Sequence, residues 1–193
     1  LKLVILSDFH AGPRKSKARY NRLFRQVQDL QPDMILLGGD FVESHGEAIY
    51  ELSGLGLLKP RLGMYFILGN HDYWDHPRLV ADGLTSFGAT EVTNQVIDLE
   101  HGTQRLRLVG MDDAWFGTPT FPSVWDPSVP TVILTHEVDI LSDLPEGVGD
   151  IVFLGHTHGG QIRLPYIGSL APLPQEAPGW LDQGLKTWRK MRL

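Results

Sequence analysis

LKLVILSDFH, residues 1–10, joins an apolar run to an acidic and an imidazole side chain. The run is rich in the aliphatic and β-branched types that fill buried strands. Asp8 and His10 are separated by one residue, so in extended geometry both side chains point the same way and can grip one ion. This stretch predicts a buried strand with two potential metal ligands at its carboxyl end.

Four further apolar runs end in the same way, at residues 33–39, 63–69, 131–135 and 150–155. The polar residues that follow them are Asp40, then Asn70, His71 and Asp72, then His136, and finally His156 and His158. Strand ends in α/β proteins are where ligands are held. The five clusters therefore predict one shared site.

The segments between the first runs carry helix signals. Residues 16–30 place apolar side chains at the spacing of an amphipathic helix, and further helices are predicted around 47–58 and 77–87, the last closed by Gly88. Strands that alternate with helices form βαβ units, which favour parallel neighbours. An α/β fold follows.

The middle of the chain changes character. Residues 90–98 and 104–110 predict a hairpin of antiparallel strands, and segment 114–130, rich in proline and aromatic residues, predicts an irregular loop. No internal repeat interrupts the pattern, and the length suits one core, so residues 1–193 are expected to form a single domain.

Composition limits the partners. The chain has 193 residues, of which 42% are apolar, and its formal net charge is −6. With no Lys/Arg-rich stripe, binding of nucleic acid is not expected. The chain lacks cysteine, which excludes thiolate ligands and disulfides, and its apolar runs are strand-sized. A cytoplasmic and a membrane-associated location both stay open, as does the oligomeric state.

Seven of the polar residues supply nitrogen or oxygen ligands, which is too many for one ion and suits two ions that share a carboxylate. The seven are Asp8, His10, Asp40, Asn70, His136, His156 and His158. Imidazole with carboxylate and no sulfur favours Mn, Fe, Zn, Co or Ni. Two such ions can clamp a displacement at phosphorus and lower the pKa of a bridging water. Hydrolysis of a small phosphate ester is the natural reaction.

One histidine is left over from the ligand count. A proton must reach the leaving oxygen, so His71 is the candidate acid, and Asp72 is expected to orient it.

The same residues resemble a known family. Asp8-Phe9-His10, Gly39-Asp40, Gly69-Asn70-His71-Asp72, His136 and Gly155-His156-Thr157-His158 are similar, in this order, to the five-block signature of the calcineurin-like metallophosphoesterases. The resemblance implies an αββα sandwich of two mixed β-sheets flanked by helices. It assigns Asp8, His10, Asp40 and His158 to one metal and Asp40, Asn70, His136 and His156 to the other, so that Asp40 bridges.

The run GHTHGGQIRLP, residues 155–165, is similar to a branch of small bacterial phosphodiesterases related to YkuE and YaeI. Glu43 stands where the purple acid phosphatases carry a tyrosine ligand, so an iron-tyrosinate centre is not expected. The branch continues beyond a segment such as residues 190–193, which suggests a C-terminal truncation and a second sheet that is incomplete here.

Several other features leave two interpretations open. The cations Arg14, Lys15, Lys17 and Arg19 either contact a substrate phosphate or form a solvated helix start. Trp74, Trp115 and Phe116 either wall a pocket or pack against loops, and Asp112 and Asp113 are expected to cap a loop. Trp180, Leu181, Leu185 and Trp188 share a loosely helical face that either packs on the sheet, which is favoured, or rests peripherally on an anionic membrane.

The function predicted from these residues is a phosphoesterase that uses two divalent metals, with phosphodiesters as the preferred class and a nucleotide- or lipid-linked substrate. Two alternatives belong to other classes. A binding module can keep the fold as a non-catalytic scaffold, and a dinuclear hydrolase can act on another ester or on an amide.

Overall fold

The first apolar runs form a four-stranded sheet in which all neighbours are parallel, in the order β1-β2-β3-β4. The computed structural model describes residues 1–122, 126–169 and 183–193. The strands of this sheet are Leu3–Leu6 (β1), Met34–Gly38 (β2), Met64–Ile67 (β3) and Thr90–Glu91 (β4). The βαβ units predicted from the sequence are therefore confirmed.

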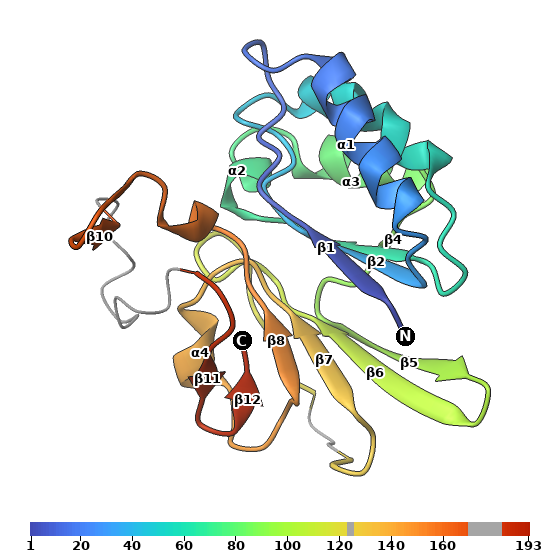
Figure 1. Ribbon diagram of the computed structural model, residues 1–193, viewed down its shortest axis with the longest axis vertical. Helices are drawn as coiled ribbons and strands as arrows, with labels where there is room; N and C mark the ends of the chain where they lie inside the picture. The colour runs from blue at the N-terminus through green and yellow to red at the C-terminus, as the bar shows by residue number, and fades with distance from the viewer. Residues whose placement is uncertain (123–125, 170–182) are drawn as a thin grey trace.

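Helices cover one face of this sheet, as Figure 1 shows. Their bounds are Lys17–Asp29 (α1), Gly46–Leu57 (η1, a 3₁₀ helix), Asn70–Tyr73 (α2) and Pro77–Ser86 (α3). Alternate residues of β2 explain the layering, because Ile35 and Leu37 face the helices while Met34 and Leu36 face the other way. Because β2 is buried on both faces, its sequence is a continuous run of apolar residues.

The second sheet is mixed and has the order β11-β12-β8-β7-β6-β5. Its strands are Gln95–His101 (β5), Gln104–Gly110 (β6), Thr131–Leu134 (β7), Ile151–Phe153 (β8), Thr187–Trp188 (β11) and Met191–Arg192 (β12). Strands β6, β7, β8 and β12 run parallel, and antiparallel pairs close both ends. Of the two large sheets in the described residues only this one is mixed, whereas the family resemblance implied two mixed sheets.

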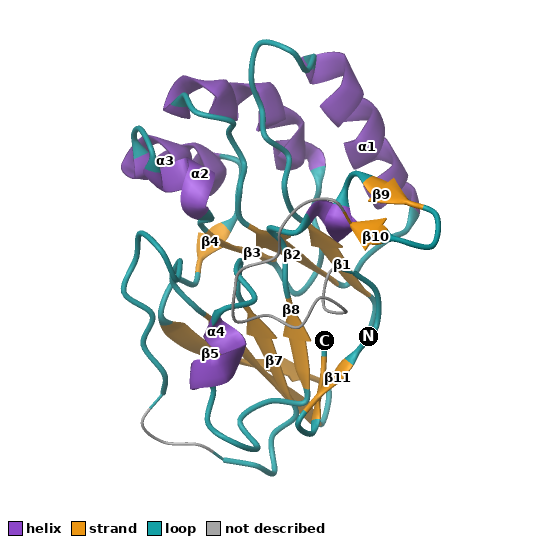
Figure 2. Cartoon of the chain, turned by 90° about the vertical axis from the view of Figure 1, so that its left-hand side faces the viewer, coloured by secondary structure: helices purple, strands orange, loops and turns teal. Residues whose placement is uncertain are grey.

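Three apolar cores separate the layers. The first lies between the helices and the first sheet, and the second lies between the two sheets and includes Leu36 and Leu134. The third lies beneath the short helix α4, Ile140–Asp143, which lies on the outer face of the second sheet (Figure 2). This arrangement is the expected αββα sandwich, with a thick helical layer on one side and a thin one on the other.

Two predicted segments fold differently. Residues 90–91 were expected in the hairpin, but they pair with β3, and the chain turns at Asn94, whose φ of 55° lies in the left-handed region, before β5 begins. The helical face predicted near the C-terminus is wrong for residues 187–192, which form a hairpin with Trp188 packed against the third core. Trp180 and Leu181 lie outside the described residues, as do residues 123–125 of the predicted loop.

The chain between the last ligands and the C-terminal hairpin contains short elements, His158–Gly160 (η2), Arg163–Leu164 (β9) and Gly168–Ser169 (β10). Among the residues that the structure describes, no helix has the length and apolar character needed to cross a membrane.

Candidate metal centre

The loops that follow β1, β2, β3, β7 and β8 are joined by hydrogen bonds at one edge of the sandwich. The backbone N–H of His10 donates to the carbonyl of Asp40 at 2.9 Å, and that of His71 donates to Asp40 Oδ1 at 2.9 Å. Across the two sheets, the N–H of His156 donates to Asp8 Oδ1 at 3.0 Å. The five clusters found in the sequence therefore lie together in space.

Five of the seven candidate ligands have left-handed backbone conformations, with positive φ angles. They are Asp8 (57°), His10 (44°), Asp40 (54°), His156 (65°) and His158 (49°). Such conformations cost free energy in residues other than glycine, and they concentrate at functional sites. The turn at each strand end thus aims its side chain at a common point.

Glycines let these loops approach closely. A Cβ on Gly69 would lie 2.5 Å from Asp40 Oδ1, and one on Gly155 would lie 2.9 Å from Asp8 Oδ2. Neither position has room for a larger residue. Glycine is therefore needed at both positions for the close packing of the loops.

The first potential ligand group contains Asp8, His10, Asp40 and His158, each of which offers one ligand atom within 4.8 Å of the others. The Nε2 atoms of His10 and His158 are 2.9 Å apart. His10 Nε2 also lies 3.5 Å from Asp40 Oδ2, and His158 Nε2 lies 3.3 Å from Asp8 Oδ1. Two imidazole nitrogens and two carboxylates thus converge on one point.

The second group contains Asp40, His136 and His156. His136 Nε2 is 3.2 Å from Asp40 Oδ2, and Asn70 Oδ1 joins the group at 3.1 Å from His156 Nδ1. Asp40 belongs to both groups, as a bridging carboxylate would. The structure therefore brings the seven predicted ligands together around Asp40.

The donor atoms fit divalent cations. His136 Nδ1 lies 2.6 Å from the carbonyl oxygen of Gly38 and donates to it, so Nε2 is the ring nitrogen that would bind a cation. That Nε2 is buried and has no hydrogen-bond partner among the described residues. A buried, unpartnered imidazole nitrogen beside a carboxylate suits a metal ligand.

The charges in the site perturb its titration. Burial alone would raise the pKa of Asp8, but His158 and His136 offset it and hold the pKa at about 2. Burial lowers the pKa of His10 to about 4. Burial would also lower the pKa of His136, but the Asp40 carboxylate overrides it and raises the pKa to about 10. Ionised carboxylates are thus paired with buried imidazoles, and a bound cation would take the place of the imidazolium protons.

His71 lies beside the first group but is not one of its predicted ligands. Its ring centroid is 4.5 Å from that of His10, and its Nδ1 lies 2.6 Å from the carbonyl oxygen of Glu43. The indole of Trp74 also contacts the His71 ring, at 3.8 Å between centroids and an angle of 34° between the ring planes. The backbone of Glu43 and the ring of Trp74 therefore hold this imidazole in place.

The expectation that Asp72 orients His71 is wrong. Both oxygens of the buried Asp72 accept hydrogen bonds from backbone amides, with Oδ1 accepting from Phe41 and Val42 and Oδ2 from Gly69. Burial nevertheless raises its pKa to about 7. Asp72 ties the loop after β2 to the loop after β3, and so it supports the site through the backbone.

Two acids near the site were not singled out from the sequence as parts of it. Glu43 Oε2 lies 3.5 Å from His10 Nδ1, so this carboxylate faces the back of a metal-ligand candidate. Glu137 is fully buried behind His136, and burial together with Asp113 raises its pKa. For Glu43, the sequence signal was its place three residues after Asp40.

Asp112 and Asp113 cap the loop after β6, as predicted. Asp112 accepts a hydrogen bond from the N–H of Thr118, and Asp113 accepts from those of Trp115 and Phe116. This capping brings the ring of Trp115 to 4.6 Å from that of His156. Trp74 and Trp115, both about half exposed, thus flank opposite sides of the site.

Comparison with known sequences agrees with this geometry. Residues 1–160 match the calcineurin-like phosphoesterase family. The chain is 29% identical over 175 residues to phosphodiesterase YaeI of Escherichia coli, covering 86% of this chain and 64% of YaeI. It is 28% identical over 184 residues to the metallophosphoesterase YkuE of Bacillus subtilis, covering 90% and 63%.

A third relative is UDP-2,3-diacylglucosamine pyrophosphatase LpxG of Chlamydia muridarum, 28% identical over 216 residues, covering 86% of this chain and 66% of LpxG. The chain spans less than two thirds of the length of YaeI and YkuE.

Solved structures share the fold. The phosphopantetheinyl hydrolase PptH of Mycobacterium tuberculosis superposes with a TM-score of 0.58 at 12% identity, covering 99% of this chain and 86% of that chain. The NAD nucleotidase NadN of Haemophilus influenzae gives 0.52 at 11% identity, covering 82% and 38%. With its sandwich fold, its five polar strand ends and the match over residues 1–160, this chain belongs to the calcineurin-like phosphoesterase family.

Proposed function

We propose that the protein is a phosphoesterase that uses two divalent metal ions and hydrolyses small phosphodiesters. The observation that carries this proposal is the shared carboxylate, because Asp40 belongs to both ligand groups. Two divalent cations held there would neutralise phosphate charge and lower the pKa of an attacking water. Mn, Fe, Zn, Co and Ni all suit the imidazole and carboxylate donors.

The relatives support a phosphorus substrate. YaeI is named a phosphodiesterase and LpxG a pyrophosphatase, and both activities break a bond between phosphorus and oxygen. A diester leaves an alkoxide of high pKa, which needs a proton. We therefore propose a small phosphoester as the substrate, and we do not expect the protein to bind nucleic acid.

His71 is the residue that we assign to the leaving group. Its Nδ1 donates to the carbonyl of Glu43, so Nε2 is the nitrogen that gives the proton. The indole of Trp74 restricts rotation of the ring. In this proposal His71 protonates the departing oxygen, and the seven ligand residues would hold the metal ions that neutralise the charge of the phosphoryl group.

The test is metal content measured together with turnover of bis-p-nitrophenyl phosphate. We expect about two metal ions per chain and hydrolysis that is lost on chelation and restored by the metal. Metal content and activity should fall together as the pH drops through the histidine range, because ligation requires neutral imidazoles. Tight metal binding without turnover of diester, monoester or amide probes would favour a scaffold, and turnover of amides alone would favour the other hydrolase class.

A further inference from the structure

A cavity of about 420 Å³ opens beside the metal centre, between residues 12–15 and residues 43–45. His10 lies at its buried inner end. The two walls are joined at their base, because the N–H of Ala11 donates to Phe41 and the N–H of Glu43 donates to Ala11. The cavity is therefore built into the strand-end loops, as preformed ligand pockets usually are.

The cavity lies next to the candidate acid, His71. Glu43 lines it, and the carbonyl oxygen of the same residue holds His71 Nδ1 at 2.6 Å. The His71 ring is also next to His10, at 4.5 Å between centroids. The cavity and the candidate acid are therefore neighbours, because His10 and Glu43 lie next to both.

Cations predominate among the charged residues of the wall. Arg14 is exposed and Lys15 is partly buried, whereas Glu43 is the one carboxylate among the described lining residues and already faces the His10 ring at 3.5 Å. The turn that carries the cations is rigid, because the N–H of Lys15 donates to Gly12 across Pro13. The two cations stand out because the chain as a whole has a formal net charge of −6.

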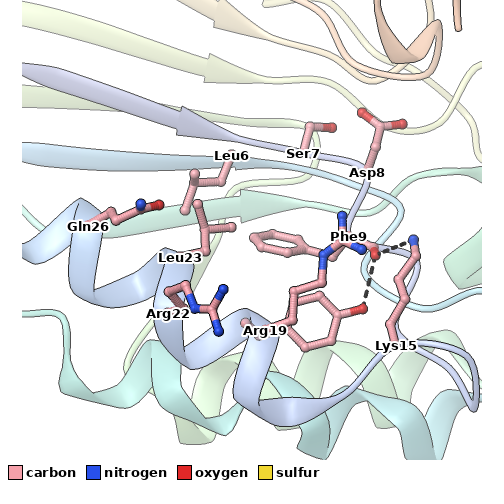
Figure 3. A pocket seen from close by; sticks show the side chains of 10 residues that line it. Leu6, Ser7, Asp8, Phe9, Lys15, Arg19, Arg22, Leu23 and Gln26 are labelled. Carbon is pink, nitrogen blue, oxygen red and sulfur yellow. Dashed lines mark hydrogen bonds between the residues drawn. The ribbon is translucent and has the colours of Figure 1, made fainter.

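Lys15 is fixed in position. Its ammonium donates to the carbonyl of Phe9 at 2.9 Å, and the Tyr20 hydroxyl donates to the same oxygen at 3.2 Å (Figure 3). Phe9 stands between the ligand candidates Asp8 and His10, so the ammonium lies against the metal-binding turn. Figure 3 looks into a neighbouring cavity that Lys15 also borders, in which Asp8 points away from Arg19 and Arg22.

We propose that this cavity is the leaving-group subsite, and that Arg14 and Lys15 select a leaving alcohol that carries a second phosphate. The inference rests on the proposed function. In the reaction, water adds to phosphorus, the bond from phosphorus to the leaving oxygen breaks, and His71 gives that oxygen a proton. The phosphorylated alcohol then departs with its own phosphate intact. Arginine and lysine are suited to bind that second phosphate through charge-assisted hydrogen bonds.

The test compares two diesters, glycerophosphoglycerol and glycerophosphoglycerol phosphate, on the metal-loaded protein. If phosphorylated glycerol leaves, the second probe gives two molecules of glycerol phosphate. If the other glycerol leaves, it gives free glycerol and glycerol bisphosphate. We expect the first product set, and a kcat/KM at least about ten-fold higher than for glycerophosphoglycerol, which is the value of one good charge-assisted contact.

Substitution of the cations should remove the preference. Arg14→Ala changes an exposed side chain, so we expect the fold and metal content to persist, the KM for the phosphorylated probe to rise about ten-fold, and free glycerol to appear. Lys15→Met should act in the same direction. Arg25→Ala is the matched control, because Arg25 is an exposed cation of α1 outside the lining residues. It should change neither the KM nor the products.

Two failures can be told apart. Equal efficiency on both probes, or an Arg14→Ala defect of the same size on glycerophosphoglycerol, would overturn the subsite alone. Absence of hydrolysis of these probes and of bis-p-nitrophenyl phosphate would overturn the proposed function, and the subsite with it.

Discussion

The two halves of the sandwich contribute differently to the site. The first half, β1 to β4, has a purely parallel sheet under the helices α1, η1, α2 and α3, and its loops supply Asp8, His10, Asp40 and Asn70. The second half has a mixed sheet whose described outer layer contains only the short helix α4, and it supplies the remaining three histidines.

Burial varies among the ligands of both halves, because His136 of the second half is fully buried. Asp40 and Asn70, at 1% and 3% exposure, sit deep in the first half, whereas the His158 side chain is 39% exposed at the edge of the second. The better-covered half thus holds the shared carboxylate, and the thinner half completes each ligand group. A dinuclear site of this kind depends on the docking of the two sheets as much as on either sheet.

The largest expected effect comes from Asp40, which both groups share. Asp40→Asn should lose both metal ions and more than about 10³-fold in kcat, because removal of even one electrostatic partner of a transition state costs about 10²–10³. Elemental analysis of the purified variant would check the metal content. As controls, Asp8→Asn and His156→Gln should each weaken one ion, since each belongs to one group. Full occupancy of either site in Asp40→Asn would refute the bridge.

The next effect concerns the residue that lies beside the ligands without joining them. His71→Ala should keep the metal content and lose about 10²- to 10⁴-fold on diesters with alkyl leaving groups, because loss of a general acid has this size. Turnover of bis-p-nitrophenyl phosphate should fall much less, since p-nitrophenolate leaves without a proton. Equal losses on both substrates would argue against the acid role.

Stability should differ between the thick and thin outer layers. Leu52→Ala, in the core under η1, should lower the free energy of unfolding by about 4 kcal/mol, whereas Leu141→Ala, on α4, should lower it by about 2 kcal/mol. Both leucines are buried, but a single-turn helix can settle into the space left behind. Denaturant unfolding of the two variants would measure this, with Leu185→Ala, 77% exposed, as the control. A larger loss of unfolding free energy for Leu141→Ala than for Leu52→Ala would show that the core under α4 is the more tightly packed one.

The smallest effect is a dependence on pH far from the site. Arg61, together with the backbone N–H of Lys2, lowers the pKa of Asp33 from 3.8 to about 2. Because the folded-state pKa lies below the unfolded value, the stabilisation is present above about pH 4 and is lost as the pH falls toward 2.

Asp33→Asn should therefore be slightly less stable than the parent at pH 7 and equal to it near pH 2, as urea midpoints at both values would reveal. Asp98→Asn removes the ion pair with Arg107 in the second half, and it should change stability with pH in the same direction. A difference at pH 7 that persists at pH 2 would point to another cause.

The sequence predicted the parts of the site that depend on local order. Asp8 and His10 follow a continuous apolar run, so strand and ligands could be read together, and the same holds for His156 and His158. The helix over 16–30 was also correct, because its apolar face repeats every turn and Pro32 follows it.

What the sequence missed depends on contacts between distant segments. The carboxylate of Asp72 binds amides of residues 41 and 42, and no spacing rule connects those positions. Thr90 and Glu91 join the first sheet because Asn94 turns the chain after them, whereas their composition suits either sheet. Trp188 was placed on a helix because its apolar neighbours fit a helical spacing, but two-residue strands leave almost no periodicity to detect.

The distribution of ligands over both sheets has a consequence for a chain without cysteine. Asp8 follows the first strand and His158 lies beyond β8, so an ion bound by both would cross-link two positions that are far apart in the sequence. Such a link restricts the unfolded chain as a long-range disulfide does, although only while the ion is retained. Chelation should then loosen the docking of the two sheets as well as stop turnover, so metal supply would set the lifetime of the folded protein.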